Sequence, residues 1–111
     1  MKREQKVEKT ELMNYYTGCR IIFSHYGEEN QKKQLIQELS ELIVAITKND
    51  LENIIEEIAD VEVMLDQFKI AKPEIQHKID TVMLHKVKRQ LQRIHNEQSS
   101  ERIIKCQNQK H

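Results

Sequence analysis

Residues 35–68 read LIQELSELIVAITKNDLENIIEEIADVEVMLDQF. Two apolar stripes recur in these residues with the helical period of about 3.6 residues, and the predicted fold is built on them. The first stripe consists of Leu35, Leu39, Leu42, Ile43 and Ile46, and the second of Ile54, Ile58, Val61, Leu65 and Phe68. Because only Asn49 and Asp50 separate the two halves, we predict an antiparallel helical hairpin with the stripes facing each other.

Acidic side chains accompany both stripes at matching positions. Glu38 and Glu41 flank the first stripe, and Glu57 and Asp60 flank the second on the equivalent side. Glu41 and Glu57 are each eight residues from Asn49, while Glu38 and Asp60 are each eleven. At a rise of about 1.5 Å per residue, the partners lie roughly level. We therefore predict that four carboxylates converge beside an apolar core.

Four converging carboxylates repel one another, which raises their pKa values or destabilises the fold. A divalent cation relieves this repulsion. Oxygen ligands suit Mg²⁺ or Mn²⁺, and the lack of Cys and His in the cluster argues against zinc. Glutamates three residues apart are also common on solvated helix faces, so the metal interpretation depends on two matched pairs.

The rest of the chain also favours helices. Its 111 residues fit one domain and include only two Gly and one Pro, which leaves few turn signals for a sheet. We predict an all-α fold with helices over roughly residues 5–24, 30–48, 51–72 and 73–97. Asp50 is expected to cap the third helix, and Pro73 to occupy the first turn of the fourth. Residues 1–98 then form one helical domain, and residues 99–111 a polar, frayed tail.

The charge is distributed unevenly, although the net charge is zero. Residues 28–66 carry eleven acids and three bases, whereas residues 73–111 carry eight bases and four acids. An acidic centre can hold a cation, and a basic half can meet phosphate or nucleic acid. With 38% hydrophobic residues, the chain buries a limited core alone, so we expect it to form oligomers.

Membrane insertion and secretion are not indicated. No apolar run approaches the roughly 20 residues that a membrane span needs, and the N-terminus is charged instead of signal-like. Cys19 and Cys106 lie far apart and show no metal-ligand spacing. We interpret them as free thiols in a reducing compartment, which favours the cytoplasm.

Three blocks resemble the MazG-like all-α nucleoside triphosphate pyrophosphohydrolases. They are YGEENQ (26–31) leading into QELSEL (37–42), NIIEEIADVEVML (53–65) and KVKRQLQRI (86–94). The resemblance covers about residues 15–95; Gln37 stands where many relatives carry another Glu. It implies a four-helix MazG-like bundle assembled as a dimer or tetramer, in a stand-alone form.

The resemblance also implies hydrolysis of a (d)NTP to the (d)NMP and pyrophosphate, with Mg²⁺ (or Mn²⁺) on Glu38, Glu41, Glu57 and Asp60. Glu41 is our candidate for the carboxylate that orients or deprotonates water. Lys86 and Arg89 are candidates for phosphate binding, since their spacing places them on one face of the last helix. Tyr15, Tyr16 and His25 are candidates for the base pocket, although aromatic residues on an amphipathic helix are more often core.

Two other classes remain open. Val44 and Val63 lie opposite their stripes, so a non-catalytic helical oligomerisation or interaction module is one alternative. Nucleic-acid binding through Lys86, Lys88, Arg89 and Arg93 is another, but few aromatic residues and no binding motif accompany that run. Base and sugar specificity cannot be read from the pattern.

Overall fold

The computed structural model describes residues 9–109, and the side chains from Asn14 to Asn108. Within that range every element is a helix and there is no strand: α1 (Lys9–Tyr26), α2 (Glu28–Lys48), α3 (Leu51–Ala71) and α4 (Pro73–Gln109). The all-α prediction is confirmed, while residues 5–8 of the predicted first helix lie outside the described part. The chain divides into two units, Met1–Pro73 and Glu74–His111.

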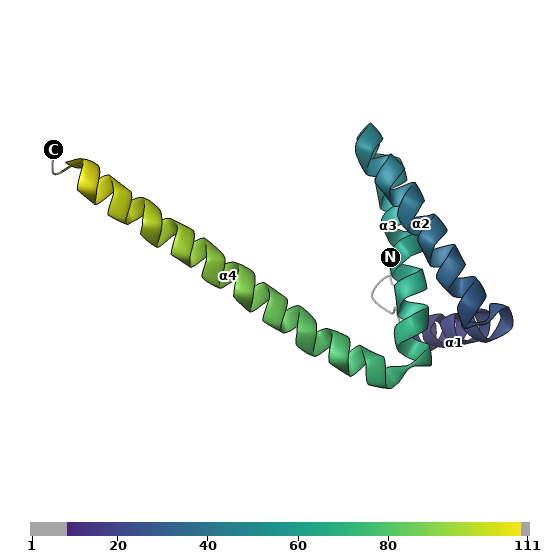
Figure 1. Ribbon diagram of the computed structural model, residues 1–111. Coiled ribbons are helices and arrows are strands. Elements are labelled where there is room, and N and C mark those ends of the chain that lie inside the picture. Colours follow the sequence, from purple (N-terminus) through teal and green to yellow (C-terminus); the bar gives the residue numbers. More distant parts are fainter. Residues whose placement is uncertain (1–8, 110–111) are drawn as a thin grey trace. The chain divides into compact units, whose positions relative to one another are not determined.

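The α2–α3 hairpin forms as predicted, with the two helices side by side (Figure 1). Asn49 ends α2 in the left-handed conformation, with φ of 56°. The N–H groups of Asn49 and Asp50 donate to the carbonyls of Ile46 and Ala45, which satisfies the end of the helix. Asp50 then caps α3, because its carboxylate accepts from both the backbone and side-chain nitrogens of Asn53.

Gly27 forms the corner between α1 and α2. Its φ of 86° and ψ of 157° belong to a region that only glycine adopts readily. The N–H of Gly27 donates to the Phe23 carbonyl at 2.9 Å, and its own carbonyl accepts from Gln31 at 3.0 Å. The corner therefore continues the hydrogen bonding of both helices while the chain changes direction.

Two side-chain contacts fix helix α1 to the C-terminal half of α3. The rings of Phe23 and Phe68 meet edge to face, with centroids 5.1 Å apart. The Tyr15 hydroxyl donates to the Asp66 carboxylate at 2.7 Å. Cys19, also on α1, is buried. Nearby, an ion pair joins Glu28, at the start of α2, to Lys72, at the end of α3.

The face on which α2 meets α3 differs from the one we predicted. Leu39, Ile43 and Ile46 of the predicted stripe remain 41%, 65% and 56% exposed. Ala45 is buried instead, and Glu38 is half-buried. The helix is thus rotated toward its acidic flank, with the small Ala45 at the contact. This correction brings carboxylates into the boundary between the helices and leaves an apolar stripe on the surface of the unit.

Apart from its first residue, α4 belongs to the second unit; the helix runs for 37 residues from Pro73, as predicted, to Gln109. The prediction that the helix ends near residue 97 was wrong. Residues 98–109 contain no Gly or Pro and are mostly residues that tolerate a helix, so nothing in them ends it. Among the described residues, no helix is long and apolar enough to cross a membrane.

Candidate active site

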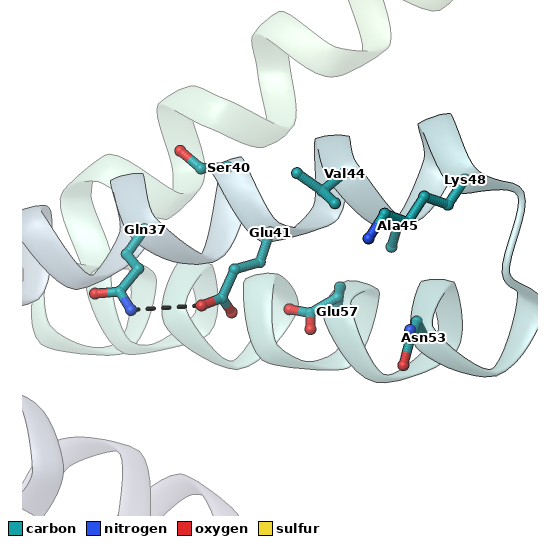
Figure 2. Close-up of a pocket in the computed structure, with 8 residues that line it drawn as sticks. All are labelled: Gln37, Ser40, Glu41, Val44, Ala45, Lys48, Asn53 and Glu57. Atoms are coloured by element: carbon teal, nitrogen blue, oxygen red, sulfur yellow. Dashed lines mark hydrogen bonds between the residues drawn. The ribbon is translucent and has the colours of Figure 1, made fainter.

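Three of the four predicted acids come together between α2 and α3. Glu38, Glu41 and Glu57 each offer a carboxylate oxygen, and these oxygens all lie within 4.8 Å of one another. Figure 2 shows Glu41 and Glu57 directed into the space between the two helices. Asp60 is exposed and lies outside this three-acid group, but its charge acts on both Glu38 and Glu57.

The environment makes two of these carboxylates harder to ionise. Desolvation raises the pKa of Glu57 above its usual value, and the charges of Glu41, Asp60 and Glu38 add to that rise. A hydrogen bond from Gln34 lowers the pKa of Glu38, but desolvation and the charges of Asp60 and Glu41 outweigh it, so the net shift is upward. The group therefore carries electrostatic repulsion that a cation would relieve.

Two carboxylate oxygens of the group are buried and, within the described part of the chain, accept no hydrogen bond. They are Oε2 of Glu38 and Oε2 of Glu57. The other oxygen of Glu38 accepts from Gln34 at 2.8 Å, and Glu41 accepts from Gln37 at 3.4 Å (Figure 2). A buried acceptor without a partner is costly, and hard oxygen donors at this spacing suit a divalent cation such as Mg²⁺. The residues present fit a metal ion.

Two grooves border the three-acid group. The hairpin groove, of about 350 Å³, lies toward the α2–α3 turn, and Figure 2 shows its lining: Gln37, Ser40, Glu41, Val44, Ala45, Lys48, Asn53 and Glu57. The corner groove, of about 580 Å³, extends toward the end of α1, and it is lined by Ile22, Tyr26, Asn30, Gln31, Lys33, Gln34, Gln37, Glu38, Met64 and Gln67. An extended ligand can therefore contact the acids at one place and a groove on either side.

The three aromatic candidates on α1 lie elsewhere. Burial, together with the hydrogen bond to Asp66, raises the pKa of the Tyr15 hydroxyl above its usual range. Tyr16 and His25 line separate hollows along α1 that contain none of the acids. The structure does not bring these three side chains to the two grooves at the acids, and their base-binding role stays a prediction.

The structure brings other residues of α1 and α2 to the acids. Ile22 and Tyr26 of α1 line the corner groove. Lys48 lines the hairpin groove beside Glu41 and Glu57. We did not select Lys48 from the sequence, although it follows Glu41 by seven residues, two helical turns, and so shares its face.

The predicted phosphate-binding residues belong to the second unit. Lys86 and Arg89 are both exposed on α4. Their spacing puts them on one face of that helix, as predicted. Their contact with phosphate stays a prediction.

Comparison with known proteins agrees with the resemblance in the sequence. The family model described as the MazG nucleotide pyrophosphohydrolase domain matches residues 26–97. This range contains the three acids, Asp60, and the whole of α2 and α3. No curated protein and no solved structure matches the chain.

Proposed function

Because the chain belongs to the MazG nucleotide pyrophosphohydrolase family, we propose that it hydrolyses a (d)NTP to the (d)NMP and pyrophosphate in a Mg²⁺-dependent reaction. The observation that carries the proposal is the group of Glu38, Glu41 and Glu57, with two buried oxygens that lack a partner. A purely structural hairpin gains nothing from acids in this place, because they raise its free energy.

Glu38, Glu41 and Glu57 would hold the cation, with Asp60 as a fourth ligand from its exposed position beside them. A bound Mg²⁺, or Mn²⁺, neutralises phosphate charge and lowers the pKa of a coordinated water. The oxygen-only donor set supports this choice of metal over zinc.

Glu41 is the proposed general base. It is the exposed member of the group, and Gln37 holds one of its oxygens by a hydrogen bond. Its carboxylate accepts a proton from the attacking water while the water oxygen forms a bond to the α-phosphorus. The bond from that phosphorus to the bridging oxygen breaks, and pyrophosphate leaves. Lys48 in the hairpin groove offsets the charge of the leaving group. Phosphate binding by Lys86 and Arg89 stays a prediction from the sequence.

The test is pyrophosphate release from a panel of canonical (d)NTPs in Mg²⁺, Mn²⁺ or EDTA. We expect metal-dependent monophosphate and pyrophosphate from the wild type. Glu41→Gln should lose turnover by a factor of about 10² or more. The matched control is Glu62→Gln, the same change at an exposed acid of α3 outside the group, which should keep full activity. Equal activity in Glu41→Gln and the control would contradict the role of Glu41.

The exposed apolar stripe supports oligomerisation, in the enzyme or in a non-catalytic module. Leu39, Ile43 and Ile46 form it on α2, and Val44 is 50% exposed on the same helix. We propose that a second copy covers this stripe in a dimer or tetramer. Light scattering should show a larger particle than the monomer, and Ile43→Glu should shift it to the monomer.

The enzyme and the non-catalytic module are separated by neutralising the acids. Alanine at Glu38 and Asp60 removes repulsion, so it should stabilise the metal-free protein in either case. In the enzyme it also abolishes turnover, whereas in a module it leaves the interaction intact.

Both cysteines are free thiols, which supports the proposed cytoplasmic location.

A further inference from the structure

Two buried glutamines, one from α2 and one from α3, line the corner groove. Gln31 and Gln67 are only 4% and 2% exposed, and Nε2 of Gln31 donates to Oε1 of Gln67 at 2.7 Å. Within the described part of the chain, their other side-chain hydrogen bonds are to the sulfur of Met64, at 4.0 Å and 3.6 Å. Since a thioether is a weak acceptor, the pair keeps hydrogen-bonding capacity that the protein does not use.

If the pair only filled space between the helices, its burial would raise the free energy of the folded state. Each carboxamide has two donor hydrogens and an oxygen that can accept twice, so one mutual bond satisfies only part of it. Met64, which both carboxamides contact, is apolar and buried, and apolar side chains of similar volume would fill the same space without the polar cost. Buried polar groups that face a cavity are typical of ligand-binding positions.

The pair and the acids share one groove. Gln31, Gln67 and Glu38 all line the corner groove, and so do the apolar side chain of Ile22 and the ring of Tyr26. Gln31 precedes Glu38 by seven residues, which is roughly 10 Å along the helix axis. That separation is comparable to the reach from the pairing edge of a nucleobase to the α-phosphate of its nucleotide.

We propose that Gln31 and Gln67 determine base recognition, by hydrogen-bonding the Watson–Crick edge of the base while its phosphates lie at the acids. This inference rests on the proposed function. The ligand class is a nucleotide whose base carries a donor beside an acceptor on that edge, and Tyr26 and Ile22 supply surface for the ring. If both carboxamides rotate by about 180°, Gln67 donates to Gln31 instead, so their mutual hydrogen bond is kept while the donors and acceptors that face the groove change places. The pair can therefore bind a base with the donor and acceptor in either order, and it disfavours a base that lacks the donor or the acceptor.

The experiment compares natural nucleotides with analogues that lack the exocyclic group at the pairing edge. The pairs are dCTP with the 2-pyrimidinone deoxyribonucleoside triphosphate, and dATP with the purine deoxyribonucleoside triphosphate. These analogues remove a hydrogen-bonding group without adding bulk. In the wild type, kcat/KM for the better natural nucleotide should exceed that for its analogue by about 10-fold or more, since an unpaired buried polar group opposes binding.

The decisive variant is the double substitution Gln31→Met and Gln67→Met. Because it removes both partners, it leaves no carboxamide unpaired, and it should unfold at or above the wild-type temperature. Gln67→Met alone leaves Gln31 without its partner and should unfold at a lower temperature. The double variant should bring the kcat/KM ratio of nucleotide to analogue close to one. Gln92→Met, the same change on the exposed surface of α4, should keep the wild-type ratio.

A folded double variant with the wild-type ratio would overturn the inference and leave the proposed function standing. If the wild type releases no pyrophosphate from any nucleotide, the proposed function fails instead. Calorimetric titration with dCMP, dAMP and their analogues in Mg²⁺ then decides the inference alone. An affinity that depends on the exocyclic group and is lost in the double variant supports it, whereas equal or absent affinities overturn it.

Discussion

Gly27→Ala tests whether the α1–α2 corner has the backbone conformation that shapes the corner groove. Gly27 has φ of 86° and ψ of 157°, a region in which other residues cost about 1–3 kcal/mol. A Cβ at this position meets nothing within 4 Å, so the whole cost comes from the backbone. The substitution also lowers the conformational entropy of the unfolded chain, which stabilises the folded state by about 0.4–1 kcal/mol. The net loss should be about 1–2 kcal/mol.

Thermal unfolding followed by circular dichroism measures this loss. For a unit of this size, about 1 kcal/mol shifts the Tm by roughly 4 °C or more, so Gly27→Ala should lower it by about 4–8 °C. Both grooves and the acids should persist in the folded fraction, because the added methyl group contacts nothing.

Gly18→Ala is the matched control, and its expected change in Tm has the opposite sign. Gly18 lies inside α1, and a Cβ there also meets nothing within 4 Å. Alanine is the better helix former by about 0.5–1 kcal/mol, so the Tm should rise. If Gly27→Ala raised the Tm as Gly18→Ala does, the positive φ at the corner would be refuted, and with it the path of the chain between Tyr26 and Gln31.

Three further predictions concern stability and the acids. Because the pKa values of Glu38 and Glu57 are raised, the metal-free folded state binds more protons than the unfolded state at pH values above the usual Glu pKa of 4.5. The denaturant midpoint of the metal-free protein should therefore increase as the pH falls from neutral toward 4.5. Saturating Mg²⁺, or the substitution Glu57→Gln, should weaken this pH dependence. Asp50→Ala removes the cap of α3 and should cost about 1 kcal/mol in urea titrations; a midpoint equal to that of the wild type would show that the cap adds nothing. Tyr15→Phe removes the hydrogen bond to Asp66 and should cost about 0.5–1.5 kcal/mol, while nucleotide preference stays unchanged; an altered preference would return Tyr15 to the base pocket.

Local features of the fold followed directly from the sequence. Asp50 caps α3, Pro73 starts α4, and a connection of two residues makes α2 and α3 antiparallel. Each of these depends on a residue and its nearest neighbours in the chain, which the sequence states. The end of α4 was missed for a related reason: polar composition suggests fraying, but no residue between 98 and 109 breaks a helix.

The candidate site was predicted in part. Counting residues from Asn49 predicted that Glu41 lies level with Glu57 and Glu38 level with Asp60, and three of these four acids, Glu38, Glu41 and Glu57, do come together. Counting did not establish how far each helix is rotated about its axis. That rotation brings Glu38 and Glu57 into the boundary between the helices and leaves Asp60 exposed outside the group.

Most helix bounds, the Asp50 cap, the hairpin and the set of acids could therefore be predicted from the pattern of residues, because spacing along a helix fixes which side chains share a face. Which face of each helix meets its neighbour depended on tertiary packing. An apolar stripe such as Leu39, Ile43 and Ile46 can pack equally well against its own chain or against another subunit, and periodicity does not distinguish the two. The burial of Gln31 and Gln67 depends on that choice, since a glutamine is ordinarily a surface residue until a neighbouring helix covers it.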